Sequence, residues 1–170
     1  GDSQEMKAQM LKDKHVIEGL AILGQFTTFY AAPNTGKTLI TLAGIKAQIE
    51  AGEILGKDVF YVNADDSYNA AVAKIEIAEE CGMEMLVPNQ NGFKTKDMIP
   101  ILEELTSQKK ARDKVVVLDT LKKFTDLMDK RSAAAFGHVA REFVAVGGTL
   151  ICLAHTNKHK NSDGRGVYAG

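Results

Sequence analysis

The stretch Ala31 to Thr38, which reads A-A-P-N-T-G-K-T, decides how the rest of the chain is interpreted. The residues before it, Gln25 to Ala31, are rich in β-branched and aromatic side chains and predict a strand. The residues after it predict a helix from Lys37 to about Ala51, which Gly52 ends. A loop that leaves a strand and enters a helix turns successive backbone N–H groups toward one concave space. This stretch, called here the cradle loop, therefore predicts a binding site for an anion.

The side chains of the cradle loop indicate which anion it binds. Gly36 permits close backbone approach, the Lys37 ammonium can reach the β- and γ-phosphates of a nucleotide, and the Thr38 hydroxyl can ligate magnesium. The pattern therefore predicts ATP with Mg2+ as the ligand. The residues predicted to bind it are Pro33, Asn34, Thr35, Gly36, Lys37, Thr38 and Leu39. The alternative is a Pro-Asn turn before a helix that happens to begin with Gly-Lys-Thr, and the flanking strand and helix favour the nucleotide.

A second segment, Lys114 to Thr120 (K-V-V-V-L-D-T), is a run of apolar residues that ends in a carboxylate. Ligands of parallel α/β sheets lie at the carboxyl ends of the strands, so Asp119 is expected beside the cradle loop. There it can contact Mg2+ directly or through a bound water. The alternative is an aspartate that caps the next helix. The predicted metal residues are therefore Thr38 and Asp119.

Strands and helices alternate along the rest of the chain. Short, nearly continuous apolar runs predict strands that are buried on both faces, at Val59 to Asn63, Met85 to Val87, Val115 to Asp119 and Thr149 to His155. Amphipathic or capped segments predict helices from Asp66 or Ser67 to about Cys81, from Asp97 to about Lys110 and from Ser132 to Val146. The order predicts an α/β fold, a mainly parallel sheet with helices on both faces.

The length and composition of the chain limit the number of domains and the kinds of partner that are expected. With 170 residues, 45% apolar and 25% charged, the chain is expected to form a single domain over 1–170, with a helical lead-in at 1–20 and a truncated C-terminal end. A net charge of -1 gives no global attraction to nucleic acid. Cys81 and Cys152 lack metal or redox spacing and are expected to be reduced. No run reaches the roughly 18 apolar residues of a membrane span, which predicts a cytoplasmic protein without a membrane partner.

From about Gly24 to Gly170 the chain resembles the RecA-like P-loop ATPases, and among them the RepA-like hexameric replicative helicases. V-V-V-L-D-T-L-K-K-F resembles the Walker B segment of that group, and H-T-N-K with a later Gly-Arg-Gly turn resembles its sensor segment. The resemblance implies a hexameric ring that couples ATP hydrolysis to single-stranded DNA. It also implies an arginine supplied by a neighbouring subunit, from a segment later than these residues.

The resemblance also assigns catalytic roles to Lys37, Asp65 and His155. In the family a carboxylate, usually Glu, orients the attacking water, and Asp65 of N-A-D-D-S aligns with it. Because Asp is one methylene shorter, hydrolysis is expected to be slower. Asp65 and Asp66 can instead provide one helix cap and one solvated charge. His155 aligns with the residue that senses the γ-phosphate, although a histidine at a strand end can also be structural.

Basic residues elsewhere carry weaker signals. Lys158, His159, Lys160 and Arg165 suit a loop that contacts DNA phosphates or a neighbouring subunit, and an ordinary solvated loop is an equal alternative. Lys122 and Lys123, at the predicted start of a helix, are expected to have a plain surface role, and contact with a neighbouring subunit is the alternative.

Two functions from different classes are consistent with the sequence. The main one is a RecA-like motor domain of a replicative helicase that binds and hydrolyses MgATP. The alternative is an ATP-switched assembly module that resembles KaiC-like or RadA-like ATPases, with slow hydrolysis, and Asp65 in place of Glu favours it. A small-molecule kinase fits less well, because neither a lid nor a motif for an acceptor substrate is apparent.

Overall fold

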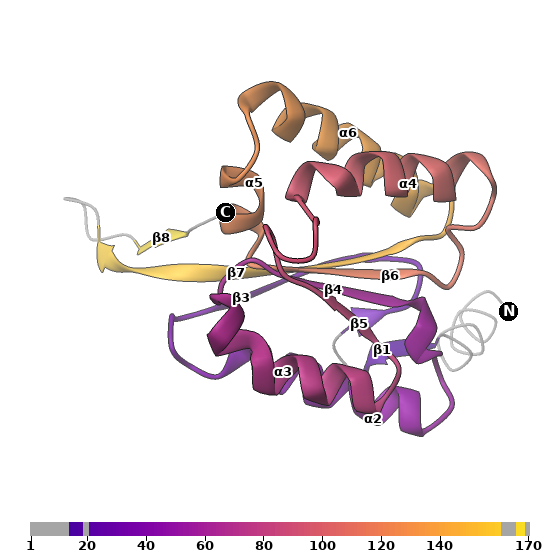
Figure 1. The fold of residues 1–170 in the computed structure, drawn as a ribbon, viewed down its shortest axis with the longest axis horizontal. Coiled ribbons are helices and arrows are strands. Elements are labelled where there is room, and N and C mark those ends of the chain that lie inside the picture. Colours follow the sequence, from indigo (N-terminus) through magenta and orange to yellow (C-terminus); the bar gives the residue numbers. More distant parts are fainter. Residues whose placement is uncertain (1–13, 19–20, 161–165, 169–170) are drawn as a thin grey trace, which may run out of the picture.

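The computed structural model describes residues 14–18, 21–160 and 166–168 (Figure 1). Its main sheet contains five parallel strands in the spatial order β3-β7-β6-β4-β5. Their bounds are β3 Phe26–Ala31, β4 Val59–Asn63, β5 Glu84–Leu86, β6 Val115–Asp119 and β7 Thr149–Lys160. The mainly parallel α/β sheet predicted from the sequence is confirmed.

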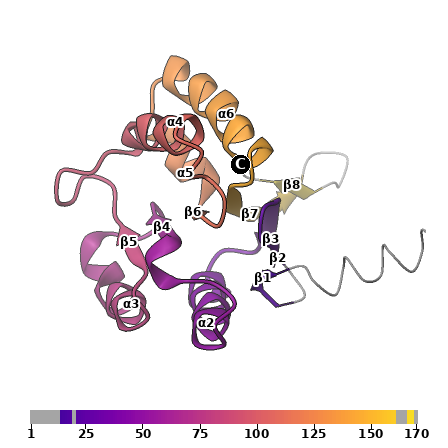
Figure 2. The ribbon, with the colours of Figure 1, turned by 90° about the vertical axis from the view of Figure 1, so that its right-hand side faces the viewer.

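Helices cover both faces of this sheet, as Figures 1 and 2 show. One face carries α2 (Lys37–Glu50) and α3 (Tyr68–Glu80). The other face carries α4 (Met98–Ser107), α5 (Leu121–Asp126) and α6 (Lys130–Ala145). Two 3-10 turns, η1 (Gly56–Asp58) and η2 (Thr95–Asp97), precede β4 and α4. The three-layer arrangement leaves the carboxyl ends of the strands open to a ligand.

Strand β6 shows how the sequence divides the core. Side chains alternate between the two faces of a strand, so Val115 and Val117 pack into the cluster that contains α2, whereas Val116 and Leu118 pack against α4, α5 and α6. Asp119 follows in the same alternation as Val117. Its carboxylate therefore points to the α2 face, where the cradle loop enters its helix.

The insertion of β7 between β3 and β6 collects the predicted site residues at one edge of the sheet. In the β3–β7 ladder Ala31 is opposite His155, and in the β6–β7 ladder Asp119 is opposite Leu153. In the β4–β6 ladder Asn63 is opposite Asp119. The cradle loop, His155, Asp119 and the segment that follows Asn63 are thereby neighbours, although they come from four different parts of the chain.

The N-terminal region differs from its prediction. Residues 1–13 and 19–20 of the expected helical lead-in lie outside the described residues, but His15–Ile17 forms a strand, β1, that pairs antiparallel with β2 (Ala21–Ile22). Helix was therefore the wrong prediction for residues 15–17. Val16 and Ile17 are buried in the cluster that includes α2, and Ile17 is opposite Ala21 of β2.

The C-terminal region differs as well. β7 continues past His155 to Lys160 and pairs antiparallel with β8 (Gly166–Tyr168), so residues 156–160 form a strand where a loop was expected. Arg165 lies outside the described residues. Cys81 and Cys152 are both free, as predicted. Within the described part of the chain, none of the helices combines the length and apolar character that a membrane span requires.

Candidate functional site

The cradle loop has the backbone shape that its sequence predicts. Asn34 and Gly36 adopt positive φ angles of 63° and 74°, and the Thr35 hydroxyl donates a 2.7 Å hydrogen bond to the Ala32 carbonyl. α2 begins at Lys37 without a side-chain cap and without an acidic residue in its first turn. The N–H groups of that turn are therefore left for an external anion. Pro33 begins the turn and Leu39, which is exposed, lies in the first turn of α2.

Thr38 and Asp119, the two predicted metal residues, are in direct contact. The Thr38 hydroxyl donates to Asp119 Oδ2 at 2.5 Å, and the Tyr61 hydroxyl donates to the same oxygen at 2.7 Å. Asp119 is fully buried, and its other oxygen, Oδ1, has no hydrogen-bond partner among the described residues. Such an atom is costly to bury unless another group completes its coordination.

This arrangement fits a magnesium ion. Mg2+ takes oxygen ligands and usually combines one or two protein oxygens with water and phosphate oxygens. Burial raises the pKa of Asp119, although the bonds from Thr38 and Tyr61 and the charge of Lys37 oppose the shift. A nearby cation would favour the charged carboxylate. No cluster of three or more metal-binding side chains occurs in the described part of the chain, so an ion held here would depend on phosphate and water for its remaining ligands.

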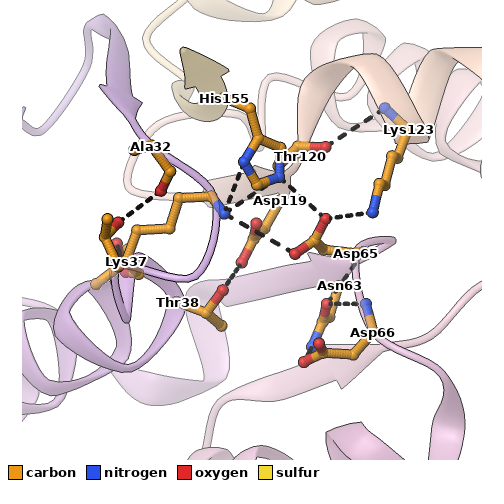
Figure 3. A network of polar contacts seen from close by, with 12 residues as sticks. Ala32, Lys37, Thr38, Asn63, Asp65, Asp66, Asp119, Thr120, Lys123 and His155 are labelled. Carbon is orange, nitrogen blue, oxygen red and sulfur yellow. Dashed lines mark hydrogen bonds and ion pairs between the residues drawn. The ribbon is translucent and has the colours of Figure 1, made fainter. Parts of the chain in front are cut away.

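The three predicted catalytic residues form one polar network, which Figure 3 shows. Lys37 Nζ lies 3.3 and 3.4 Å from the two ring nitrogens of His155 and 3.8 Å from Asp65 Oδ2. His155 Nε2 lies 3.2 Å from Asp65 Oδ1. A tautomer with the proton on Nε2 satisfies both neighbours, because Nε2–H then donates to Asp65 and Nδ1 accepts from Lys37. The side chains of all three residues are less than one-fifth exposed.

A buried amide shapes the segment that carries Asp65. Asn63 Oδ1 accepts from the backbone N–H groups of Asp65 and Asp66, at 3.3 and 3.2 Å. The Asp65 N–H also donates to the Asp119 carbonyl at 3.1 Å. Asp66 pairs with Lys74 rather than capping α3, and the cap is Ser67, whose hydroxyl accepts from the Ala70 N–H. The turn after β4 is thereby fixed to β6.

Lys123 is an unexpected member of the network. Its ammonium lies 2.8 Å from Asp65 Oδ1, a contact that the expected plain surface role did not include. The reason is that α5 begins at Leu121, directly after β6, and β6 is the neighbour of β4 in the sheet, so a side chain of α5 can reach the turn that follows β4. Lys122 does behave as predicted, since it is exposed and pairs with Asp126 on its own helix.

The cations around Asp65 set its charge state. Burial raises the pKa of Asp65, but hydrogen bonds from Lys123 and His155 and the charges of Lys123 and Lys37 outweigh it and lower the pKa below the ordinary value of 3.8. A lowered pKa in the folded state means that this carboxylate contributes stability above pH 3.8, and that the contribution is lost as the pH falls through the lowered pKa.

Asp65→Asn is therefore expected to reduce the free energy of unfolding at pH 7 by a modest amount, and to make no difference well below pH 3.8. Urea unfolding of both proteins at a series of pH values measures this difference. A gap that stays constant down to the acid limit would mean that the ionised carboxylate is not what stabilises the fold.

The structure thus brings together every residue that the sequence analysis placed in the site. Their functional roles stay predictions. Three further residues contribute to the site without having been predicted, Tyr61, Asn63 and Lys123. Tyr61 and Asn63 lie in an apolar run that indicates only a buried strand, although a polar side chain at the carboxyl end of such a strand is a usable signal. Lys123 carries no such signal, because its role depends on where α5 lies.

Comparison with known proteins agrees with this geometry. A search of curated proteins finds no match. A family model described as AAA domain matches residues 3–161, which is most of the chain and includes the whole network around Lys37. The chain therefore belongs to the AAA domain family, a family of RecA-like P-loop ATPases.

Proposed function

We propose that this chain is the motor domain of a replicative DNA helicase that binds and hydrolyses MgATP. The observation that carries the proposal is the contact between Thr38 and Asp119 at 2.5 Å, directly beside the network of Lys37, Asp65 and His155. One edge of the sheet then carries an amide cradle, a cation, a buried carboxylate with an unused oxygen and a second carboxylate for water. Phosphoryl transfer from ATP needs this combination.

The cradle loop and Lys37 bind the triphosphate. N–H groups from Asn34 to Thr38 donate to phosphate oxygens, and the Lys37 ammonium neutralises charge at the β- and γ-phosphates. Thr38 and Asp119 would hold Mg2+, which supplies further positive charge against the phosphate oxygens when it is bound. Lys37 Nζ forms an ion pair with Asp65 at 3.8 Å, so a bound γ-phosphate competes with Asp65 for the same ammonium.

Asp65 positions the attacking water. One of its oxygens, Oδ1, is occupied by Lys123 and His155, whereas Oδ2 lies on the Lys37 side of the carboxylate. Oδ2 can accept a hydrogen bond from water and, as the water oxygen bonds to the γ-phosphorus, receive its proton. The bond to the β-phosphate oxygen breaks, and ADP and inorganic phosphate result. Positioning and charge account for most of the catalysis in such a reaction.

His155 links the γ-phosphate site to strand β7 and, in the proposed helicase, to DNA. It contacts Lys37 and Asp65, and it lies in β7, which continues to Lys160 and pairs with β8. We infer that loss of the γ-phosphate changes the contacts of His155 and that β7 carries the change toward single-stranded DNA. The proposal includes a hexameric ring and a cytoplasmic location, both by resemblance to replicative helicases.

The decisive experiment is the rate of ATP hydrolysis with and without single-stranded DNA. We expect single-stranded DNA to raise the turnover severalfold, since a helicase couples its ATPase cycle to DNA binding. Added salt should weaken this stimulation, because contacts to DNA phosphates are ionic. Double-stranded DNA of equal length serves as the control. Turnover that is measurable but indifferent to single-stranded DNA would contradict the helicase role and leave the ATPase in place.

One observation favours a second function, an ATP-switched assembly module with slow hydrolysis. Asp65 is shorter than the usual Glu, and three cationic or donor groups already surround it. In such a module ATP binding, not turnover, changes the assembly state. Sedimentation with ATP, with a slowly hydrolysed analogue and with ADP distinguishes the two functions, since a switch assembles equally with the first two and hydrolysis is not needed.

A further inference from the structure

Lys123 is placed by the start of a short helix. Thr120 caps α5, and its side-chain oxygen accepts a 3.4 Å hydrogen bond from the Lys123 N–H. The Lys123 ammonium then reaches 2.8 Å from Asp65 Oδ1, while 53% of the side chain remains exposed. The contact joins α5, which follows β6, to the turn that follows β4. It is therefore a tertiary contact and not a pairing within one helix.

The two oxygens of Asp65 have different surroundings. Oδ1 receives both Lys123, at 2.8 Å, and His155, at 3.2 Å. Oδ2 has Lys37 at 3.8 Å, which is beyond hydrogen-bond distance. Two donors on one oxygen restrict rotation of the carboxylate, and they leave the other oxygen toward the cradle loop. An aspartate with free rotation would sample several orientations, of which only some are productive.

We propose that Lys123 is a positioning residue, which fixes the carboxylate of Asp65 through Oδ1 so that Oδ2 is presented to the attacking water. The inference rests on the proposed function, in which Asp65 orients that water. It also answers a difficulty of this chain, since Asp is one methylene shorter than Glu and tolerates less misorientation. A second donor on Oδ1 supplies the missing constraint.

An incidental surface ion pair is the competing explanation. Ion pairs between exposed side chains contribute little, and Lys122 provides an internal example. Lys122 lies on the same helix, is 54% exposed and pairs with Asp126 at 3.0 Å. The difference lies in the partner, because Asp126 is 60% exposed and outside the network, whereas Asp65 is 19% exposed and inside it.

The test compares Lys123→Ala, Lys123→Arg and Lys122→Ala in this chain, with kcat and KM for ATP measured beside the affinity for a fluorescent ATP analogue. We expect Lys123→Ala to lower kcat on the order of tenfold or more, since misplacement by 1 Å can cost about a hundredfold. KM and analogue affinity should stay within about twofold, which also shows that the variant is folded. Lys123→Arg should recover most of the rate, and Lys122→Ala should match the wild type.

Each outcome decides something. If the wild type hydrolyses ATP and Lys123→Ala does so equally fast, Lys123 has no positioning role, while the proposed ATPase function stands. If KM rises and kcat is unchanged, Lys123 binds nucleotide instead, and the inference is again overturned. A wild type that binds ATP and does not hydrolyse it contradicts the proposed function itself, and the positioning role with it.

Discussion

Lys37→Ala is expected to reduce ATP turnover by about 10²–10³-fold, the effect of removing one preorganised charge from the transition state. The Lys37 side chain is only 10% exposed, and Lys37 is the first residue of α2, directly after the cradle loop's Gly36. Nucleotide affinity should fall as well, because the same charge binds the β- and γ-phosphates before reaction. Turnover and analogue binding, measured on the same preparation, report both effects.

A matched control for this variant exists on the same helix. Lys46 also lies on α2, but its partner is the exposed Glu80, at 3.2 Å, on α3. Lys46→Ala removes an equal charge from the same element and should leave affinity and turnover unchanged. If the Lys37 and Lys46 variants both behaved as the wild type, the cradle loop would not be the nucleotide site.

Asp119→Asn should abolish the dependence of turnover on Mg2+ and reduce the maximal rate by about 10²–10³-fold. The amide still accepts from Thr38 and Tyr61 through its oxygen but no longer carries a charge for the ion. The stability of the Asp119→Asn variant is not expected to fall with its activity. Burial raises the pKa of Asp119, so ionisation of this carboxyl lowers the free energy of unfolding as the pH rises from 3.8 through the raised pKa. At pH 7 the asparagine variant should therefore unfold at no lower urea concentration than the wild type.

Asp58 supplies the control for a buried carboxylate. It lies at the opposite end of the sheet, just before β4, and accepts a 2.7 Å hydrogen bond from Lys114. Asp58→Asn breaks a partly buried ion pair and should lower stability while preserving the response to Mg2+. The two variants are therefore expected to show opposite patterns. Asp119→Asn should lose activity and keep its stability, whereas Asp58→Asn should lose stability and keep its activity. A common loss of stability would assign Asp119 a structural role alone.

The central strands could be predicted from the sequence because their signal is strong. V-F-Y-V-N and V-V-V-L-D are bounded apolar runs, and the structure forms β4 and β6 over the same residues as predicted. Thr38 and Asp119 could be predicted together because one opens a helix and the other closes a strand of the same parallel sheet. Positions of this kind follow from topology, since the carboxyl ends of the strands share one edge.

Contacts that depend on helix placement could not be predicted in this way. Lys123 and Lys122 are adjacent and chemically identical, and only the path of α5 decides which of them reaches Asp65. The three-residue strand β1 was also missed, because so short an element depends on its partner β2 and on burial against α2 more than on its own sequence. Sequence therefore identified the ends of the elements better than the contacts between their surfaces.

The place of β7 in the sheet fixes how far apart the strands that lead to the cradle loop and to Asp119 lie. β3, which leads to the cradle loop, and β6, which ends in Asp119, are two strand spacings apart, about 9.6 Å at the usual 4.8 Å per spacing. Main-chain hydrogen bonds on both sides of β7 set this distance between β3 and β6. Substitution of core side chains by others of similar volume should leave this distance unchanged. Ile151→Pro, in contrast, would break the hydrogen-bond ladders of β7 and allow β3 and β6 to separate.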